Sequence, residues 1–185
     1  MKTSTWAILC AVLLAVGLVA EGLHGEDGPK PGKEHQVLKQ WEGTWDAVFR
    51  FIPEPGKPMA ESKGVETASV GLGGFWLTTE FRGDMMGTPF TGRGTIGYDQ
   101  QKQRYVGTWI DSMKSGLLVS EGTADERGRL FTMIAQGYSD AQGKARVMKQ
   151  VMELKDKDSR TLTFLTPNPD GKDMVVGTIE YTRRK

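Results

Sequence analysis

Apolar and polar positions alternate along two neighbouring segments of the stretch from Gly83 to Gly116. In residues 90–98 one face carries Phe90, Gly92, Gly94, Ile96 and Tyr98, and in residues 105–112 one face carries Tyr105, Gly107, Trp109 and Asp111. A period of two with aromatic and β-branched residues is typical of β-strands. The polar residues between the two segments, 99–104, predict a hairpin turn.

The alternation also predicts how these two strands pair. The simplest alignment of the hairpin places Tyr98 opposite Tyr105. Gly94 then lies opposite Trp109, so a large ring covers a position that has no side chain. Cross-strand pairs of this kind contribute roughly 0.2–1 kcal/mol each. Glycines inside strands also indicate strong bends, as at the corners of a barrel.

Segments with strand character continue through the rest of the chain, separated by turns rich in Gly, Pro and Asp. The first starts at Gly43 and alternates through Trp45, Ala47, Phe49 and Phe51; the others cover residues 61–70, 75–81, 117–124, 130–138, 146–155, 161–166 and 174–183. With the central pair they make about ten strands at a spacing of roughly 8–12 residues, which is typical of a sandwich or a closed barrel. Because closure removes exposed edges, we expect an all-β antiparallel meander closed into a barrel. A short helix over residues 34–41 precedes it.

The first 22 residues predict a secretory signal peptide. Lys2 supplies the positive start, and the apolar run from Trp6 to Val19 is shorter than the roughly 20 residues of a membrane span. Cleavage is expected near Ala20 or Gly22, and an uncleaved membrane anchor is the alternative. The mature chain is therefore expected to be secreted or periplasmic, without a stable membrane span. Residues 23–33 predict a flexible leader, and residues 34–185 a single barrel domain.

The composition and one glycine motif argue against three kinds of function: nucleic-acid binding, cysteine chemistry and dinucleotide binding. Lys and Arg number 24 against 23 Asp and Glu, so no basic surface indicates a nucleic-acid partner. The single cysteine, Cys10, lies in the predicted signal, which excludes disulfides and cysteine chemistry from the mature chain. The segment Gly92–Gly97 fits a dinucleotide-binding glycine pattern, but it lies inside one predicted strand and leads into another, whereas that mechanism needs a helix N-terminus. We therefore expect no cofactor.

A short helix followed by Gly43-Thr44-Trp45 resembles the opening of lipocalin-like (calycin) barrels. In those barrels an Arg of the last strand lies over the Trp of the first strand and closes the base. The resemblance implies that Arg183 or Arg184 does this over Trp45, in a contact that contributes roughly 0.5–2 kcal/mol.

A longer set of motifs is similar to the bacterial secreted domain-of-unknown-function family 1579. The motifs are His35-Gln36-Val37-Leu38, Gly43-Thr44-Trp45, Met86-Gly87-Thr88-Pro89-Phe90, Gly97-Tyr98-Asp99, Trp109-Ile110-Asp111-Ser112 and Ile179-Glu180-Tyr181-Thr182-Arg183. The similarity extends from about His35 to Arg184. The similarity implies a barrel fold and export of the chain, but it implies no activity, because none is assigned to the family.

Residues for catalysis or metal binding are sparse. Haem-binding barrels of similar build use a His ligand, but His35 has no partner residues, so capping or solvent exposure is the favoured role and no metal site is expected. No catalytic triad pattern is present. Three carboxylates fall in apolar strand patterns and could act in acid–base chemistry if buried: Glu80, Asp111 and Glu121. The alternative is that Asp99 and Asp111 cap turns, so no catalytic residue is assigned.

Methionines recur on the predicted strands, and Met148 and Met152 share a face with Gln150 and Leu154. Methionine commonly fills gaps in cores, and it also lines adaptable apolar sites. If the barrel is hollow, a pocket for a small apolar or amphipathic ligand would be lined by Tyr98, Trp109, Asp111, Met148 and Met152. A ligand-binding barrel is thus the preferred hypothesis. The alternatives are a pocketless envelope module that docks through Met85 and Met86, and a carboxylate-dependent enzyme. The ligand and the oligomeric state stay open.

Overall fold

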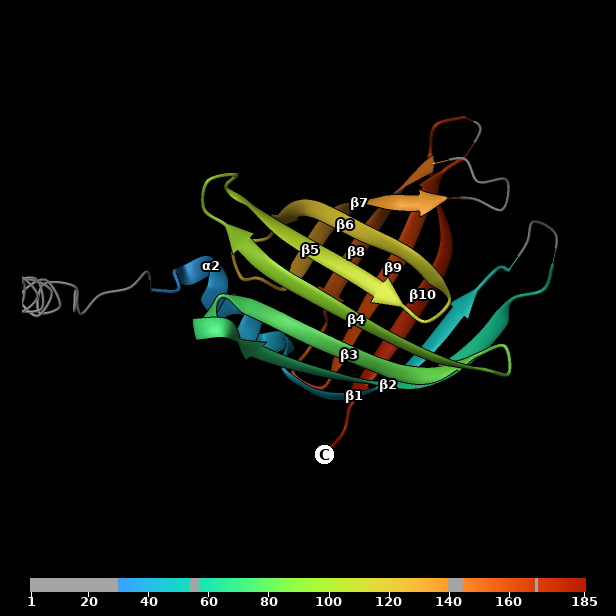
Figure 1. The fold of residues 1–185 in the computed structure, drawn as a ribbon, viewed down its shortest axis with the longest axis horizontal. Helices are drawn as coiled ribbons and strands as arrows, with labels where there is room; N and C mark the ends of the chain where they lie inside the picture. Colours follow the sequence, from blue (N-terminus) through green and yellow to red (C-terminus); the bar gives the residue numbers. More distant parts are fainter. Residues whose placement is uncertain (1–29, 54–56, 140–144, 169) are drawn as a thin grey trace, which may run out of the picture. The chain divides into compact units, whose positions relative to one another are not determined.

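Ten antiparallel strands close into a barrel in the computed structural model, which describes residues 30–53, 57–139, 145–168 and 170–185 (Figure 1). Each strand pairs with its sequence neighbours, and the first pairs with the last. The strands are β1 (Gly43–Phe51), β2 (Ala60–Gly71), β3 (Trp76–Met85), β4 (Thr88–Asp99), β5 (Arg104–Asp111), β6 (Lys114–Ala124), β7 (Leu130–Ser139), β8 (Ala145–Leu154), β9 (Ser159–Pro167) and β10 (Asp173–Arg183). The predicted fold class is confirmed. The predicted signal peptide and most of the predicted leader lie outside the described residues.

A short helical segment precedes β1, as predicted. It is an α-helix, α2 (Lys33–Gln36), that continues as a 3-10 helix, η2 (Val37–Trp41). In Figure 1 α2 lies at one end of the barrel, called here the helix end, and the turns that follow β3 and β5 lie at the other, called the far end. A second 3-10 turn, η3 (Leu72–Gly74), joins β2 and β3 at the helix end. None of the described helices is long and apolar enough to cross a bilayer.

The central hairpin has the predicted register. Tyr98 pairs with Tyr105, and Gly94 pairs with Trp109. The Trp109 ring lies where a Cβ atom on Gly92 would stand, and it also borders Gly94. The two glycines therefore leave the inner wall free for the indole to lie flat against β4.

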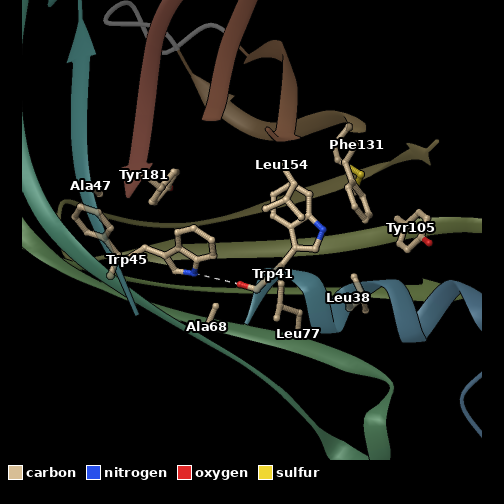
Figure 2. Packing of buried hydrophobic residues seen from close by; sticks show 12 residues of the cluster. Leu38, Trp41, Trp45, Ala47, Ala68, Leu77, Tyr105, Phe131, Leu154 and Tyr181 are labelled. Carbon is tan, nitrogen blue, oxygen red and sulfur yellow. Dashed lines mark hydrogen bonds between the residues drawn. The ribbon is translucent and has the colours of Figure 1, made fainter. Parts of the chain in front are cut away.

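The main core lies at the helix end, where η2 enters the barrel. Trp41 and Trp45 lie side by side, and the Trp45 indole N–H donates to the Trp41 carbonyl oxygen at 3.3 Å (Figure 2). Leu38 and Trp45 are fully buried, and Phe131 is 1% exposed. Full burial of such a side chain contributes roughly 1.5–3 kcal/mol. The core thus fastens the helical segment into one end of the barrel.

Candidate functional site

The helix end is sealed by Arg183, the penultimate arginine of the chain. Its guanidinium carbon lies 4.0 Å from the centroid of the Trp45 ring. The same guanidinium donates to the backbone carbonyls of Gln40, Glu42 and Lys157. Arg184 instead faces outward and pairs with Asp46 at 2.6 Å. Of the two arginines considered from the sequence, the structure places Arg183 over Trp45.

A buried ion pair inside the barrel was not predicted. Arg160 of β9 pairs with Glu66 of β2, and each residue is only 6% exposed. The Arg160 guanidinium also lies 4.3 Å from the ring centroids of Trp45 and Tyr181. The Tyr181 hydroxyl donates to Glu66 at 3.4 Å, and burial followed by the Glu66 charge raises the Tyr181 pKa well above its usual value. Among the described residues the Arg160 Nε has no hydrogen-bond partner.

His35 is buried at the helix end and is only 2% exposed. Its Nδ1 accepts the Gly32 backbone N–H, so Nε2 carries the ring proton and donates to the Tyr98 carbonyl at 3.1 Å. The capping role is present, but the predicted solvent exposure is wrong, because Phe75 and Tyr98 enclose the ring edge-on. Both ring nitrogens are thus engaged. In the described part of the chain no group of three or more His, Cys, Asp or Glu side chains is arranged to hold a metal ion.

The three carboxylates considered for catalysis cap a turn or form ion pairs on the outer surface. Asp111 accepts the Met113 backbone N–H at 2.9 Å and the Trp109 indole N–H at 3.1 Å, so it caps the turn after β5. Glu80 and Glu121 face solvent on the outer surface, where they pair with Arg93 and Lys102. The enzyme hypothesis named these three carboxylates as its support, and none of them lies beside a cation in an interior cavity.

Two hollows mark the outside of the barrel. One, of about 460 Å³, lies over β3, β4 and β5 between Glu80, Arg82 and Arg93, and the other, of about 680 Å³, lies beside η2 and Arg183. Both are open surface depressions; in the first Glu80 pairs with Arg82 and Arg93, and in the second Arg183 pairs with Asp158 outside the lining. Inside the barrel, by contrast, the inward faces of the strands are mostly apolar.

Inward-facing aromatic side chains toward the far end are only partly buried. Phe49 and Phe51 continue the inward face of Trp45 and Ala47, and their rings stack at 4.6 Å. Phe164 meets Phe49 edge-on at 5.8 Å. Other partly exposed inward side chains are Phe90, Trp109, Met148, Gln150, Leu162 and Ile179. Because these side chains point inward and are only partly buried, solvent reaches part of their surface toward the far end of the barrel. Phe90, Trp109, Leu162 and Ile179 also pack against the core.

A row of small side chains lines the middle of the inner wall. Ile96 on β4 and Met148 on β8 are joined around the inner wall by a continuous series of strand pairs, through Gly107, Ser120 and Ala135. None of these three intervening residues carries a bulky side chain. All three are nevertheless buried, with Ser120 6% and Ala135 0% exposed, so protein covers the inner wall at this level.

The structure divides the predicted ligand set between two regions. Tyr98 lies at the helix end, with its ring 5.1 Å from Tyr105, and Met152 packs against the core beside Phe131. Trp109 and Asp111 lie on the far half of β5, and Met148 lies on the far half of β8. The ligand set predicted from the sequence did not include the inward aromatic residues of β1 and β9. For β1, the alternation that continues from Trp45 to Phe51 indicated them.

Three solved structures are similar to this chain, and one of them has a TM-score above 0.5. The crystal structure of Rv2717c from M. tuberculosis is similar with a TM-score of 0.61 and 12% identity, over 83% of this chain and 99% of that chain. Two designed barrels are also similar: a redesigned β-barrel (TM-score 0.43, 12% identity, 84% of this chain and 99% of that one) and a de novo fluorescence-activating barrel (TM-score 0.41, 17% identity, 80% and 97%). At these identities the likeness to Rv2717c shows the fold alone. A search of the curated proteins found no match.

The family model described as "Protein of unknown function (DUF1579)" matches residues 30–183, which include the helical segment and all ten strands. The match agrees with the motifs around Trp45, Tyr98 and Trp109, each of which has a structural role in the barrel. The chain therefore belongs to the DUF1579 family.

Proposed function

We propose that this chain is an exported, non-enzymatic barrel protein that binds a small apolar or amphipathic ligand in the interior toward the far end. The observation that carries the proposal is the partial exposure of inward-facing rings, above all Phe49, Phe51 and Phe164. Ligand sites are typically concave and mostly apolar, with a few polar groups that fix orientation. This wall has that composition.

Removal of the rings from water would drive binding. Each Å² of apolar surface that a ligand covers contributes about 25 cal/mol. Trp109 and Met148 extend the apolar wall, and the polar groups beside it are the Asp111 carboxylate and the Gln150 amide. An elongated or ring-shaped apolar molecule with one polar end fits such a surface better than a strongly charged one, because desolvating an unpaired charge is costly.

Export rests on the sequence pattern of the first 22 residues. Expression of the full chain in a bacterial host, followed by fractionation and N-terminal sequencing, tests it. We expect a mature protein outside the cytoplasm that begins at Glu21 or Leu23. An intact N-terminus at Met1 in the membrane fraction would instead support the uncleaved anchor.

Binding is tested with N-phenyl-1-naphthylamine, an uncharged apolar dye that fluoresces when it leaves water. Met148→Trp adds bulk to the inner wall, and we expect it to weaken dye binding at least about fivefold, which corresponds to roughly 1 kcal/mol. Val147→Trp is the matched control, because Val147 is the preceding residue and faces outward. We expect the control to bind as the wild type does.

Two results would overturn this proposal. One is equal dye binding by both tryptophan variants, with each shown to be folded by its thermal unfolding. The other is repeated failure of the wild type to retain any molecule from a lipid and metabolite extract in native mass spectrometry.

A second candidate function is docking of the far end on another envelope component. Four exposed methionines favour it: Met59, Met86 and Met113 lie in three connections between strands, and Met174 lies at the start of β10. Exposed apolar groups gathered in one region mark interaction sites. Sedimentation of the wild type with and without lipid vesicles distinguishes this candidate, because an isolated ligand-binding barrel would stay in the supernatant.

A further inference from the structure

Gln150 faces the interior from the middle of β8. It pairs with Met133 of β7 and with Phe164 of β9, and it shares its face with Met148 and Met152. Met133 is 1% exposed and belongs to the buried core, so this face of β8 is the inner one. Gln150 itself is partly exposed. A primary amide therefore stands in the interior wall, surrounded by thioethers and an aromatic ring.

The Gln150 amide makes no hydrogen bond with any described residue. An amide offers two donor hydrogens and an acceptor oxygen, and an apolar neighbourhood satisfies none of them. Because Gln150 is partly exposed, water can hydrogen-bond its amide, and a polar atom of a ligand can replace that water. Burial of the amide without such a partner would be unfavourable, so an occupant of this region has to meet it.

The charged groups of the described interior are already neutralised or engaged. Arg160 pairs with Glu66, and both Asp111 oxygens accept N–H groups. The described wall thus has no unpaired positive charge to receive a carboxylate. Its available partner is a neutral amide, which suits a group that both donates and accepts hydrogen bonds.

We propose that Gln150 is the polar anchor of the ligand site, and that the ligand is an apolar molecule with one neutral hydrogen-bonding group: a hydroxyl, a carbonyl or an amide. This inference rests on the proposed function and names the class of ligand for the same site. The apolar part lies against the rings of Phe49 and Phe164, and the neutral group meets the Gln150 amide.

The test uses three molecules of equal chain length: 1-decanol, decanamide and decanoate. Each displaces N-phenyl-1-naphthylamine from the wild type and from two variants at neutral pH. We expect decanol and decanamide to bind the wild type more tightly than decanoate. Gln150→Leu should weaken both neutral ligands roughly three- to tenfold, the worth of one hydrogen bond, and leave the affinity of the dye within about twofold.

Gln136→Leu is the matched control. Gln136 lies on the neighbouring strand β7, pairs with Val119 and is exposed, so the same change is made outside the barrel. It should leave all three affinities unchanged. Thermal unfolding of both variants checks that each is folded, and an apolar side chain between Met133 and Phe164 is compatible with the fold.

The outcomes separate the two proposals. Tighter binding of decanoate than of the neutral ligands, or a Gln150→Leu variant that keeps the wild-type preference, would overturn the role of Gln150 and leave ligand binding standing. If neither the dye nor any of the three molecules binds the wild type, the proposed function fails, and this inference fails with it.

Discussion

Two glycines, which carry no side chain, determine the shape of the inner wall beside Trp109. Gly92 and Gly94 leave room for the Trp109 indole to lie on β4, and the Trp109 N–H reaches Asp111 at the end of the same strand. Asp111 in turn caps the turn after β5. One aromatic ring, two missing side chains and one carboxylate therefore set the shape of the wall at this point.

Gly92→Ala tests this arrangement. The added methyl group would overlap the Trp109 ring, so the indole has to move. We expect a destabilisation of about 1–3 kcal/mol, typical of overpacking. Gly116→Ala is the control, because the nearest atom to an added Cβ there is 4.0 Å away. Urea unfolding followed by circular dichroism measures both, and equal midpoints would contradict the packing argument.

Contacts between residues close in sequence could be predicted, whereas contacts between residues far apart in sequence could not. The Trp109–Gly94 pair was predictable, because alternation and a short hairpin fix the register locally. The Arg160–Glu66 pair was not, since its partners lie 94 positions apart and Arg160 follows an ordinary turn. The burial of His35 was missed for the same reason, although its capping role was among the expectations: the Tyr98 carbonyl that it meets is 63 positions away. No local pattern reports such contacts.

The helical segment acts as a plug that is tied to the barrel by hydrogen bonds. The Tyr105 hydroxyl donates to the Glu34 carbonyl at 2.9 Å, and the Trp41 indole N–H donates to the Gly128 carbonyl at 2.9 Å. The sequence predicted a helix over residues 34–41, but its second half is a 3-10 helix. With three residues per turn, Leu38 and Trp41 fall on one side, and both are buried in the barrel end.

Alkaline pH should loosen this plug. Burial, and then the nearby charge of Glu34, raises the pKa of Tyr105 to about 12, whereas an unfolded tyrosine titrates near about 10. The stabilising contribution is thus complete below about pH 10 and is lost as the pH rises toward about 12. Tyr105→Phe should reduce the fall in unfolding free energy between pH 9 and about 11.5.

The remaining fall in Tyr105→Phe is assigned to Tyr181, whose pKa burial also raises. Urea titrations at the two pH values measure the effect in both proteins. At pH 9 the variant should be less stable by about 1 kcal/mol, because it lacks the hydrogen bond to Glu34. An unchanged pH dependence in Tyr105→Phe would contradict the assignment.

At the scale of the whole molecule, closure joins the first and last strands through seven residue pairs, from Trp45–Arg183 to Phe51–Gly177. Because closure removes exposed edges, the sequence predicted a barrel rather than a sandwich, and the structure is a closed barrel. The alignment of Gly107, Ser120 and Ala135 around the inner wall was not predictable in this way, because it needs the register of every intervening strand.

Arg183 is the residue through which closure of the barrel and attachment of the plug can be tested together. It covers Trp45 and donates to carbonyls of η2, of the linker before β1 and of the turn after β8. Arg183→Ala removes a cation–π contact and several hydrogen bonds, so we expect a loss of about 2–4 kcal/mol in urea unfolding. Arg184→Ala removes only an exposed pair with Asp46 and should change stability far less. A loss in Arg183→Ala as small as that in Arg184→Ala would mean that the plug and the strand closure do not depend on Arg183.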